Sequence, residues 1–178
     1  AVPLRLFGIA GGKLYASVAL PGVGGSRVLL CRTHHALGPW EPVGAQGVTE
    51  GATAGAGPFV AFPPGCERLP GALFRGRLWL FGGMSGTEGR CGNKVWSLDV
   101  GARDPRWRDH GEASWCARRA HGVAVFEDRL WVFGGIDSAG APLDDAWAAT
   151  QKPAEDAVVW TPAEDEKPVD KAAVPTLD

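Results

Sequence analysis

Short apolar runs separated by glycine-rich or polar turns recur along most of the chain. The run Leu78–Phe81 reads LWLF, so large apolar side chains occupy both its odd and its even positions. A strand built this way is apolar on both faces, which is typical of a strand packed between two other sheets. Gly82 and Gly83 follow at once, and glycine permits a turn or a close backbone approach that a Cβ would obstruct. We therefore expect a strand between two sheets here, ended by a glycine turn.

The same phrase occurs twice, since RLWLFGG begins at residue 77 and RLWVFGG begins at residue 129. Another short apolar run precedes each copy, at residues 71–76 and 122–128. Three tryptophans follow in the same order at spacings of 52, 51 and 53 residues: Trp79, Trp96 and Trp107, then Trp131, Trp147 and Trp160. Each unit predicts four short strands, and corresponding tryptophans are expected to have similar surroundings.

A fainter copy opens the chain over residues 1–43, with two strands across Gly11–Gly12, a third strand in SRVLLCRT and a fourth at Trp40. We expect the chain to divide into consecutive segments. These are a diverged first unit (1–43), a Gly/Ala-rich excursion (44–65), a second unit (66–110), a third unit (111–162) and a charged flexible tail (163–178). In an alternative, the tail adds a closing strand to the first unit.

A four-stranded sheet with two apolar faces must stack on similar sheets, about 10 Å apart, and radial stacking of such sheets is a β-propeller. The third unit resembles the kelch repeat, because it carries R-x-x-H at Arg118 and His121, the pair Gly134–Gly135 and both later tryptophans. The resemblance is strong over residues 66–162, although Cys66 and Leu69 stand where R-x-x-H would fall in the second unit, and it is weak over 1–43. It implies an all-β fold, a kelch-like β-propeller or partial propeller with about three four-stranded blades.

Three blades do not close a ring, since propellers have about four to eight. An open stack leaves two apolar faces for association. Two copies related by a two-fold axis would make a six-bladed ring, as a homodimer. Alternatively, the missing blades belong to a longer protein, or the N-terminal part caps the stack. The start at Ala1 favours a processed or truncated chain.

The composition of the chain excludes some classes of binding partner. The net charge of -2 and the pI of about 6.1 give no basic surface for nucleic acid or an anionic membrane. No apolar run approaches the roughly 20 residues of a membrane-spanning helix, so we expect a soluble protein, either secreted after processing or cytoplasmic. Four widely spaced cysteines allow one or two disulfides or four free, mostly buried thiols: Cys31, Cys66, Cys91 and Cys116.

The kelch resemblance implies that the segment holding Arg118, Arg119 and His121 leads into an innermost strand near the central channel. These residues are our candidate ligand-binding residues, together with Glu67 and Arg68 at the corresponding place in the second unit. Under a structural alternative, Arg and His here hydrogen-bond loop carbonyls between neighbouring blades.

Three other groups of residues have simpler interpretations. His34–His35 is expected to be a pair of solvated loop histidines rather than a metal site, and no metal or cofactor is predicted. Cys116 is expected to pack as a small buried side chain rather than serve as a nucleophile. Asp144 and Asp145 are expected to cap a turn and to pair with an Arg of an adjacent repeat.

For function, we favour a non-catalytic interaction module that presents inter-strand loops, at residues 84–94 and 136–144, to a partner protein or a polar ligand. The alternative is an enzyme with an axial pocket, similar to kelch sugar mutarotases or cyclases, that uses Arg, His and Glu side chains.

Overall fold

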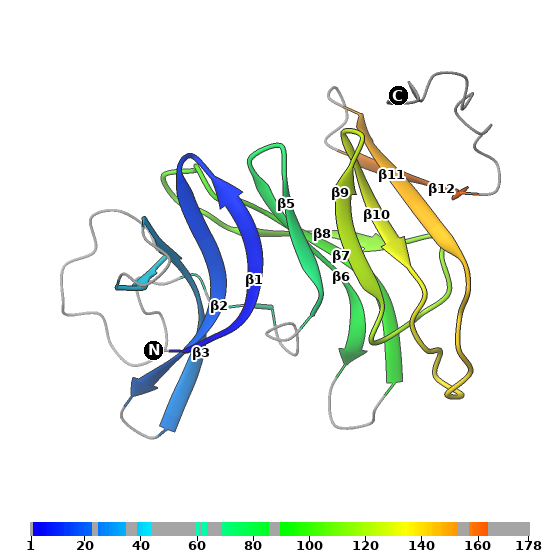
Figure 1. Cartoon of the computed structure of the whole chain (residues 1–178), viewed down its shortest axis with the longest axis horizontal. Helices are drawn as coiled ribbons and strands as arrows, with labels where there is room; N and C mark the ends of the chain where they lie inside the picture. Colours follow the sequence, from blue (N-terminus) through cyan, green and yellow to red (C-terminus); the bar gives the residue numbers. More distant parts are fainter. Residues whose placement is uncertain are drawn as a thin grey trace, which may run out of the picture.

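Three antiparallel sheets of four strands form the described part of the chain in a computed structural model (Figure 1). The structure describes residues 2–22, 25–34, 39–43, 60, 62–63, 69–85, 90–152 and 157–163. The first sheet contains β1 (Val2–Ala10), β2 (Lys13–Gly22), β3 (Gly25–Thr33) and β4 (Glu41–Pro42). The second contains β5 (Gly71–Phe74), β6 (Arg77–Ser85), β7 (Arg90–Asp99) and β8 (Trp107–Glu112). The third contains β9 (Gly122–Phe126), β10 (Arg129–Phe133), β11 (Ala146–Lys152) and β12 (Ala157–Pro162).

The strands of each sheet follow one another in sequence order, so each sheet is an antiparallel meander. The sheets meet at their first strands, because β1 lies beside β5 and β5 lies beside β9 (Figure 1). Sheets that converge on their first strands and are stacked face to face have the arrangement of propeller blades. The all-β prediction, with about three four-stranded blades, is confirmed, and the sheets are called the first, second and third blades below.

Alternate residues of β6 project into two different cores. Leu78 and Leu80 pack between the first and second blades with Phe7 and Leu30. In that core the ring of Phe62 lies 6.3 Å from the ring of Phe7 and 5.7 Å from that of Trp107.

On the opposite face of β6, Trp79 and Phe81 pack between the second and third blades with Leu130 and Val132. The ring of Phe81 meets the ring of Trp160 edge to face, at a centroid distance of 5.4 Å. All four side chains of the run Leu78–Phe81 are completely buried, so the prediction of a strand packed between two sheets is confirmed.

Trp79 and Trp131 occupy equivalent register positions, opposite alanines of the first strand of their blades. Their surroundings nevertheless differ, and the expectation of similar surroundings is wrong. Trp79 is fully buried between two blades, whereas Trp131 is partly exposed and its Nε1 donates a hydrogen bond to the carbonyl oxygen of Phe126 at 3.0 Å. The reason is that the described part of the chain places no further blade beyond the third one.

Both outer faces of the stack expose apolar side chains. On the third blade, Phe126 is 62% exposed and Phe133 is 45% exposed. These residues lie beside Trp131, on the face opposite the core residues of β10. On the first blade, Leu6 is 56% exposed and pairs in register with Ala16, which belongs to the cluster on the far side of that sheet. An apolar surface at each end of the stack is what an open series of blades would show.

Several predictions concern residues outside the described ranges: Glu67, Arg68, His35, Cys66, loop residues 86–89, most of the segment 44–65 and the tail from 164 onward. Among the described residues there is no helix with the length and apolar character needed to cross a membrane.

Candidate functional site

Three connections at one end of the second and third blades meet in a single loop surface. We define this surface as residues 91–93 at the start of β7, residues 113–121 between β8 and β9, and residues 134–145 between β10 and β11. The backbone of Arg118 links it to the second blade, because Arg118 N donates to Gly92 O at 3.1 Å and Arg118 O accepts from Gly83 N at 2.9 Å. Arg119 pairs with Ile136 of the third blade through two backbone hydrogen bonds of 2.9 Å. The segment therefore joins the two blades.

The side chain of Arg118 is fully buried at the centre of this surface. Its Nε donates to Cys116 O at 3.0 Å, and its Nη1 donates to Gly134 O at 3.0 Å. Nη1 and Nη2 also make a bidentate ion pair with the carboxylate of Asp145, at 2.5 and 2.7 Å. The guanidinium lies over the ring of Trp115, 5.5 Å from its centroid. A buried cation is tolerated only when it is paired and hydrogen-bonded in this way. The side chain of Arg118 thus bonds loop carbonyls, as the structural alternative expects, but these carbonyls belong to its own unit and not to a neighbouring blade.

Asp145, the ion-pair partner of Arg118, lies at the end of the β10–β11 connection. Its carboxylate also accepts a hydrogen bond from Trp147 Nε1 at 2.8 Å. The hydrogen bonds from Arg118 hold the pKa of this carboxyl below its usual range. The expectation of pairing with an Arg of an adjacent repeat is corrected, because Arg118 belongs to the same unit. The segment before β9 folds back over the β10–β11 connection of its own blade, and Asp144 is exposed.

His121 lies beneath this segment and is almost completely buried. Neither ring nitrogen has a hydrogen-bond partner in the described structure, and the ring lies 6.0 Å from that of Trp115. The fit is close, because a Cβ at Gly135 would lie 2.9 Å from the Cβ of His121. Burial, together with the charge of Arg118, lowers the pKa of His121 to about 4, and it outweighs the opposite effect of the nearby backbone of Phe81. His121 is therefore neutral near pH 7 and acts as part of the packing between loops.

The two predicted loops come together on the loop surface, as far as the structure describes them. Cys91 N donates to Ser138 Oγ at 3.2 Å, which links the start of β7 to the β10–β11 connection. Asp137 Oδ1 accepts from the backbone of Ala139 and of Ala141, both at 2.8 Å, and this shapes the tip of that connection. Arg119 is exposed beside these loops. The structure thus brings Arg118, Arg119 and His121 into one region.

The cysteines depart from the expected burial. Cys116 is exposed, so the prediction that it packs as a buried side chain is wrong; it lies in the irregular connection before Arg118, where its neighbours Trp115 and Arg118 occupy the interior. Cys31 is buried, Cys91 is partly buried, and the three described cysteines are free thiols. Burial raises the pKa of the Cys31 thiol to about 11, which keeps it protonated. His34 is exposed directly after β3.

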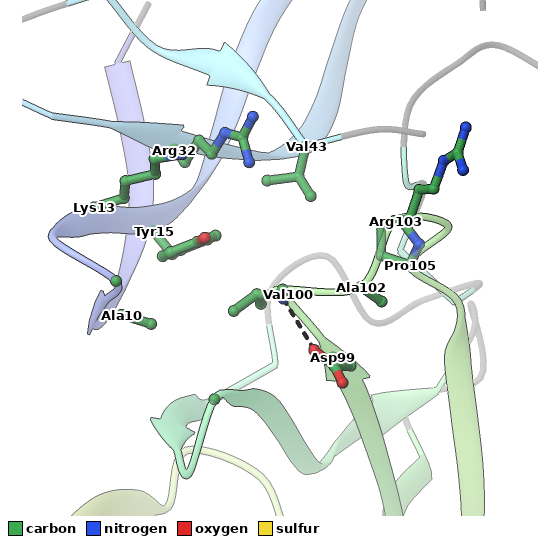
Figure 2. Close-up of a pocket in the computed structure, with 13 residues that line it drawn as sticks. Ala10, Lys13, Tyr15, Arg32, Val43, Asp99, Val100, Ala102, Arg103 and Pro105 are labelled. Carbon is green, nitrogen blue, oxygen red and sulfur yellow. Dashed lines mark hydrogen bonds between the residues drawn. The ribbon is translucent and has the colours of Figure 1, made fainter. Parts of the chain in front are cut away.

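Sequence reasoning missed a pocket at the opposite end of the blades (Figure 2). This pocket, of about 550 Å³, lies between the β1–β2 turn of the first blade and the β5–β6 and β7–β8 connections of the second. Its charged lining residues are Lys13, Arg32, Asp99 and Arg103. These residues form no motif in the sequence, because only the stacking of two blades brings them together.

The comparisons with known proteins agree with the geometry of the loop surface. A family model described as the kelch motif matches residues 117–148. The match includes the ion pair of Arg118 and Asp145 and the buried His121. A search of curated proteins finds no match to the chain.

Proposed function

Since the chain is a kelch-repeat protein with β-propeller blades, we propose that it is a non-catalytic interaction module whose loop surface binds a segment of a partner protein. One observation carries this proposal. The segment before β9 is hydrogen-bonded through Arg118 to β6 and β7 of the second blade, and through Arg119 to the β10–β11 connection of the third blade. Loops held on a rigid scaffold are the usual place for recognition in such folds.

The hydrogen bonds within the loop surface support binding because they fix its shape in advance. The side chain of Arg118 contacts backbone oxygens on two separate segments and the carboxylate of Asp145. A loop that is already ordered loses less conformational entropy when a partner binds. The buried pair is thus a support for the surface, and the exposed residues around it are the ones that would meet the partner.

The exposed side chains of the loop surface favour a partner segment that carries a carboxylate. Arg119 offers an exposed guanidinium on the loop surface, and the exposed residues of the β10–β11 connection that follow its backbone partner Ile136 include the small Ser138, Ala139 and Gly140. Guanidinium and carboxylate groups can form bidentate, charge-assisted hydrogen bonds. Small flanking residues allow a peptide backbone to approach the loop closely. We therefore expect an acidic peptide to be selected by this surface.

A peptide-display selection on the whole chain tests the proposal. Selected peptides should contain Asp or Glu, and Arg119→Ala should weaken their binding about tenfold, the effect of losing one charge-assisted contact. Arg106→Ala is the matched control, because Arg106 is an exposed arginine on the β7–β8 connection at the opposite end of the blades. Peptides that bind wild type, Arg119→Ala and Arg106→Ala equally would contradict the proposal.

A different pair of variants distinguishes the enzyme alternative from the proposed interaction module. Arg118→Ala and His121→Ala would abolish a turnover without loss of the fold if these residues formed an axial catalytic pocket. The structure supports the interaction role instead, because the donors of Arg118 are engaged by Cys116, Gly134 and Asp145.

The proposal includes assembly with a second copy of the chain. The outer face of the third blade would pack on the outer face of the first blade of the second copy, and the reverse contact would close a ring of six blades. Exposed Phe126 and Phe133 at one end of the stack, and exposed Leu6 and Ile9 at the other, support this arrangement.

A further inference from the structure

We propose that the pocket between the first and second blades binds a small phosphate monoester, at a site separate from the loop surface. The pocket has a volume of about 550 Å³, which lies within the roughly 300–1,000 Å³ of small-molecule sites. It opens at the end of the blades that carries the β1–β2 and β5–β6 turns. The loop surface lies at the other end, so occupancy of the two sites can be tested independently.

The charge of the pocket lining indicates a dianion. Lys13, Arg32 and Arg103 contribute three positive charges, and Asp99 contributes one negative charge. The carboxylate of Asp99 is partly satisfied already, since its Oδ1 accepts a hydrogen bond from Gly101 N at 2.9 Å. Glu41 lies opposite Arg32 in the β3–β4 register, but it does not line the pocket. A phosphate monoester carries a charge of about -1.5 to -2 near pH 7 and therefore balances this lining.

Arg32 gives the most direct evidence for a ligand in this pocket. Its Nε is buried and has no hydrogen-bond partner in the described structure. A buried donor of this kind is costly when it is left unpaired, and a guanidinium matches the geometry of phosphate oxygens. Figure 2 shows Arg32 and Lys13 on the wall formed by the first blade and Arg103 on the opposite wall, formed by the second.

The remaining walls favour an organic group rather than a bare anion. The buried side chains of Tyr15, Val43 and Val100 line the pocket next to its charged residues, as does Pro105 (Figure 2). An aromatic ring and aliphatic groups can cover the apolar part of a ligand while cations hold its charged end. The ligand class is therefore a phosphate ester with a small apolar organic part.

Titration calorimetry on the whole chain with phenyl phosphate tests this inference. Phenyl phosphate should bind at least tenfold more tightly than phenol, inorganic phosphate or benzoate, which lack the charge, the organic part or the second charge, respectively. Binding should weaken as salt is added, because exposed charges contribute to it. Equal binding of phenyl phosphate and inorganic phosphate, or no binding at all, would overturn the proposal.

Variants of the lining residues give the second readout. Arg103→Ala, in an exposed turn, and Arg32→Gln should each weaken binding about tenfold. Asp99→Asn should tighten binding several-fold, because it removes the negative charge but keeps an acceptor for Gly101 N. General damage to the fold would not produce opposite effects of this kind. Arg106→Ala is the control outside the pocket, and an equal loss in this variant would also overturn the proposal.

Discussion

Two buried polar residues of the loop surface, Arg118 and His121, are accommodated in opposite ways. Arg118 keeps its charge because backbone oxygens and the carboxylate of Asp145 surround it. His121 has no such partners, and it is accommodated by remaining neutral, with its pKa lowered to about 4. The cost of burying each residue is therefore met by pairing in one case and by loss of a proton in the other.

The pKa of His121 predicts a stability change between about pH 6.5 and pH 4. Its folded-state pKa of about 4 lies below the unfolded value of about 6.5, so the unfolded chain binds a proton in this interval and the folded chain does not. Stability must therefore fall as the pH is lowered through this window, by up to about 3 kcal/mol. Urea unfolding of wild type at several pH values measures this loss.

His121→Gln is the comparison variant, and it should remove most of the pH dependence between pH 6.5 and 4. The other histidines remain in this variant, so the difference between the two curves belongs to His121. Identical curves for wild type and variant would show that the residue is not buried in its neutral form.

At the scale of the elements, Gly83, the second glycine after the run LWLF of β6, occupies a position that only glycine fits well. Gly83 has a φ of +85°, and a Cβ there would overlap the side chain of Leu69. Gly76, in the β5–β6 turn, has a similar φ of +74°, but a Cβ there would meet nothing within 4 Å. The two positions thus share the backbone conformation and differ in the space available for a Cβ.

Replacement of each glycine by alanine should separate these two effects. Gly76→Ala should cost about 1 kcal/mol, the strain of a left-handed backbone for a residue with a Cβ. Gly83→Ala should cost about 2–4 kcal/mol, because overpacking against Leu69 adds to that strain. Denaturant unfolding measures both values, and equal losses would show that Leu69 does not restrict Gly83.

Much of the fold at this scale could be predicted from the sequence. The alternation in the run Leu78–Phe81 indicated a strand with two buried faces, and the repeated tryptophans located the four strands of each unit. The pair of Arg118 and Asp145 was harder to predict, because both residues were recognised but the folding of the loop back on its own blade was not. The pocket of Arg32 and Arg103 left no signal, since its residues lie on different blades and become neighbours only through stacking.

At the scale of the whole molecule, the three blades of the described residues form an open stack with an apolar surface at each end. The middle blade is covered on both faces, which explains the complete burial of Trp79 and Phe81. Within the described ranges the third blade is covered on one face only, which explains the exposure of Phe126 and Phe133. The central claim of this account is that these sheets are blades that require a neighbour on each side, and that a second copy supplies the missing neighbours.

The solution mass of the chain, measured by sedimentation equilibrium over a range of concentrations, tests this claim most directly. The account predicts a species of twice 18.7 kDa for wild type. Phe126→Asp, on the outer face of the third blade, should return the mass to 18.7 kDa, whereas Met84→Asp, an exposed apolar residue of the second blade, should leave the dimer intact. A well-folded wild-type monomer of 18.7 kDa at all concentrations would contradict the account.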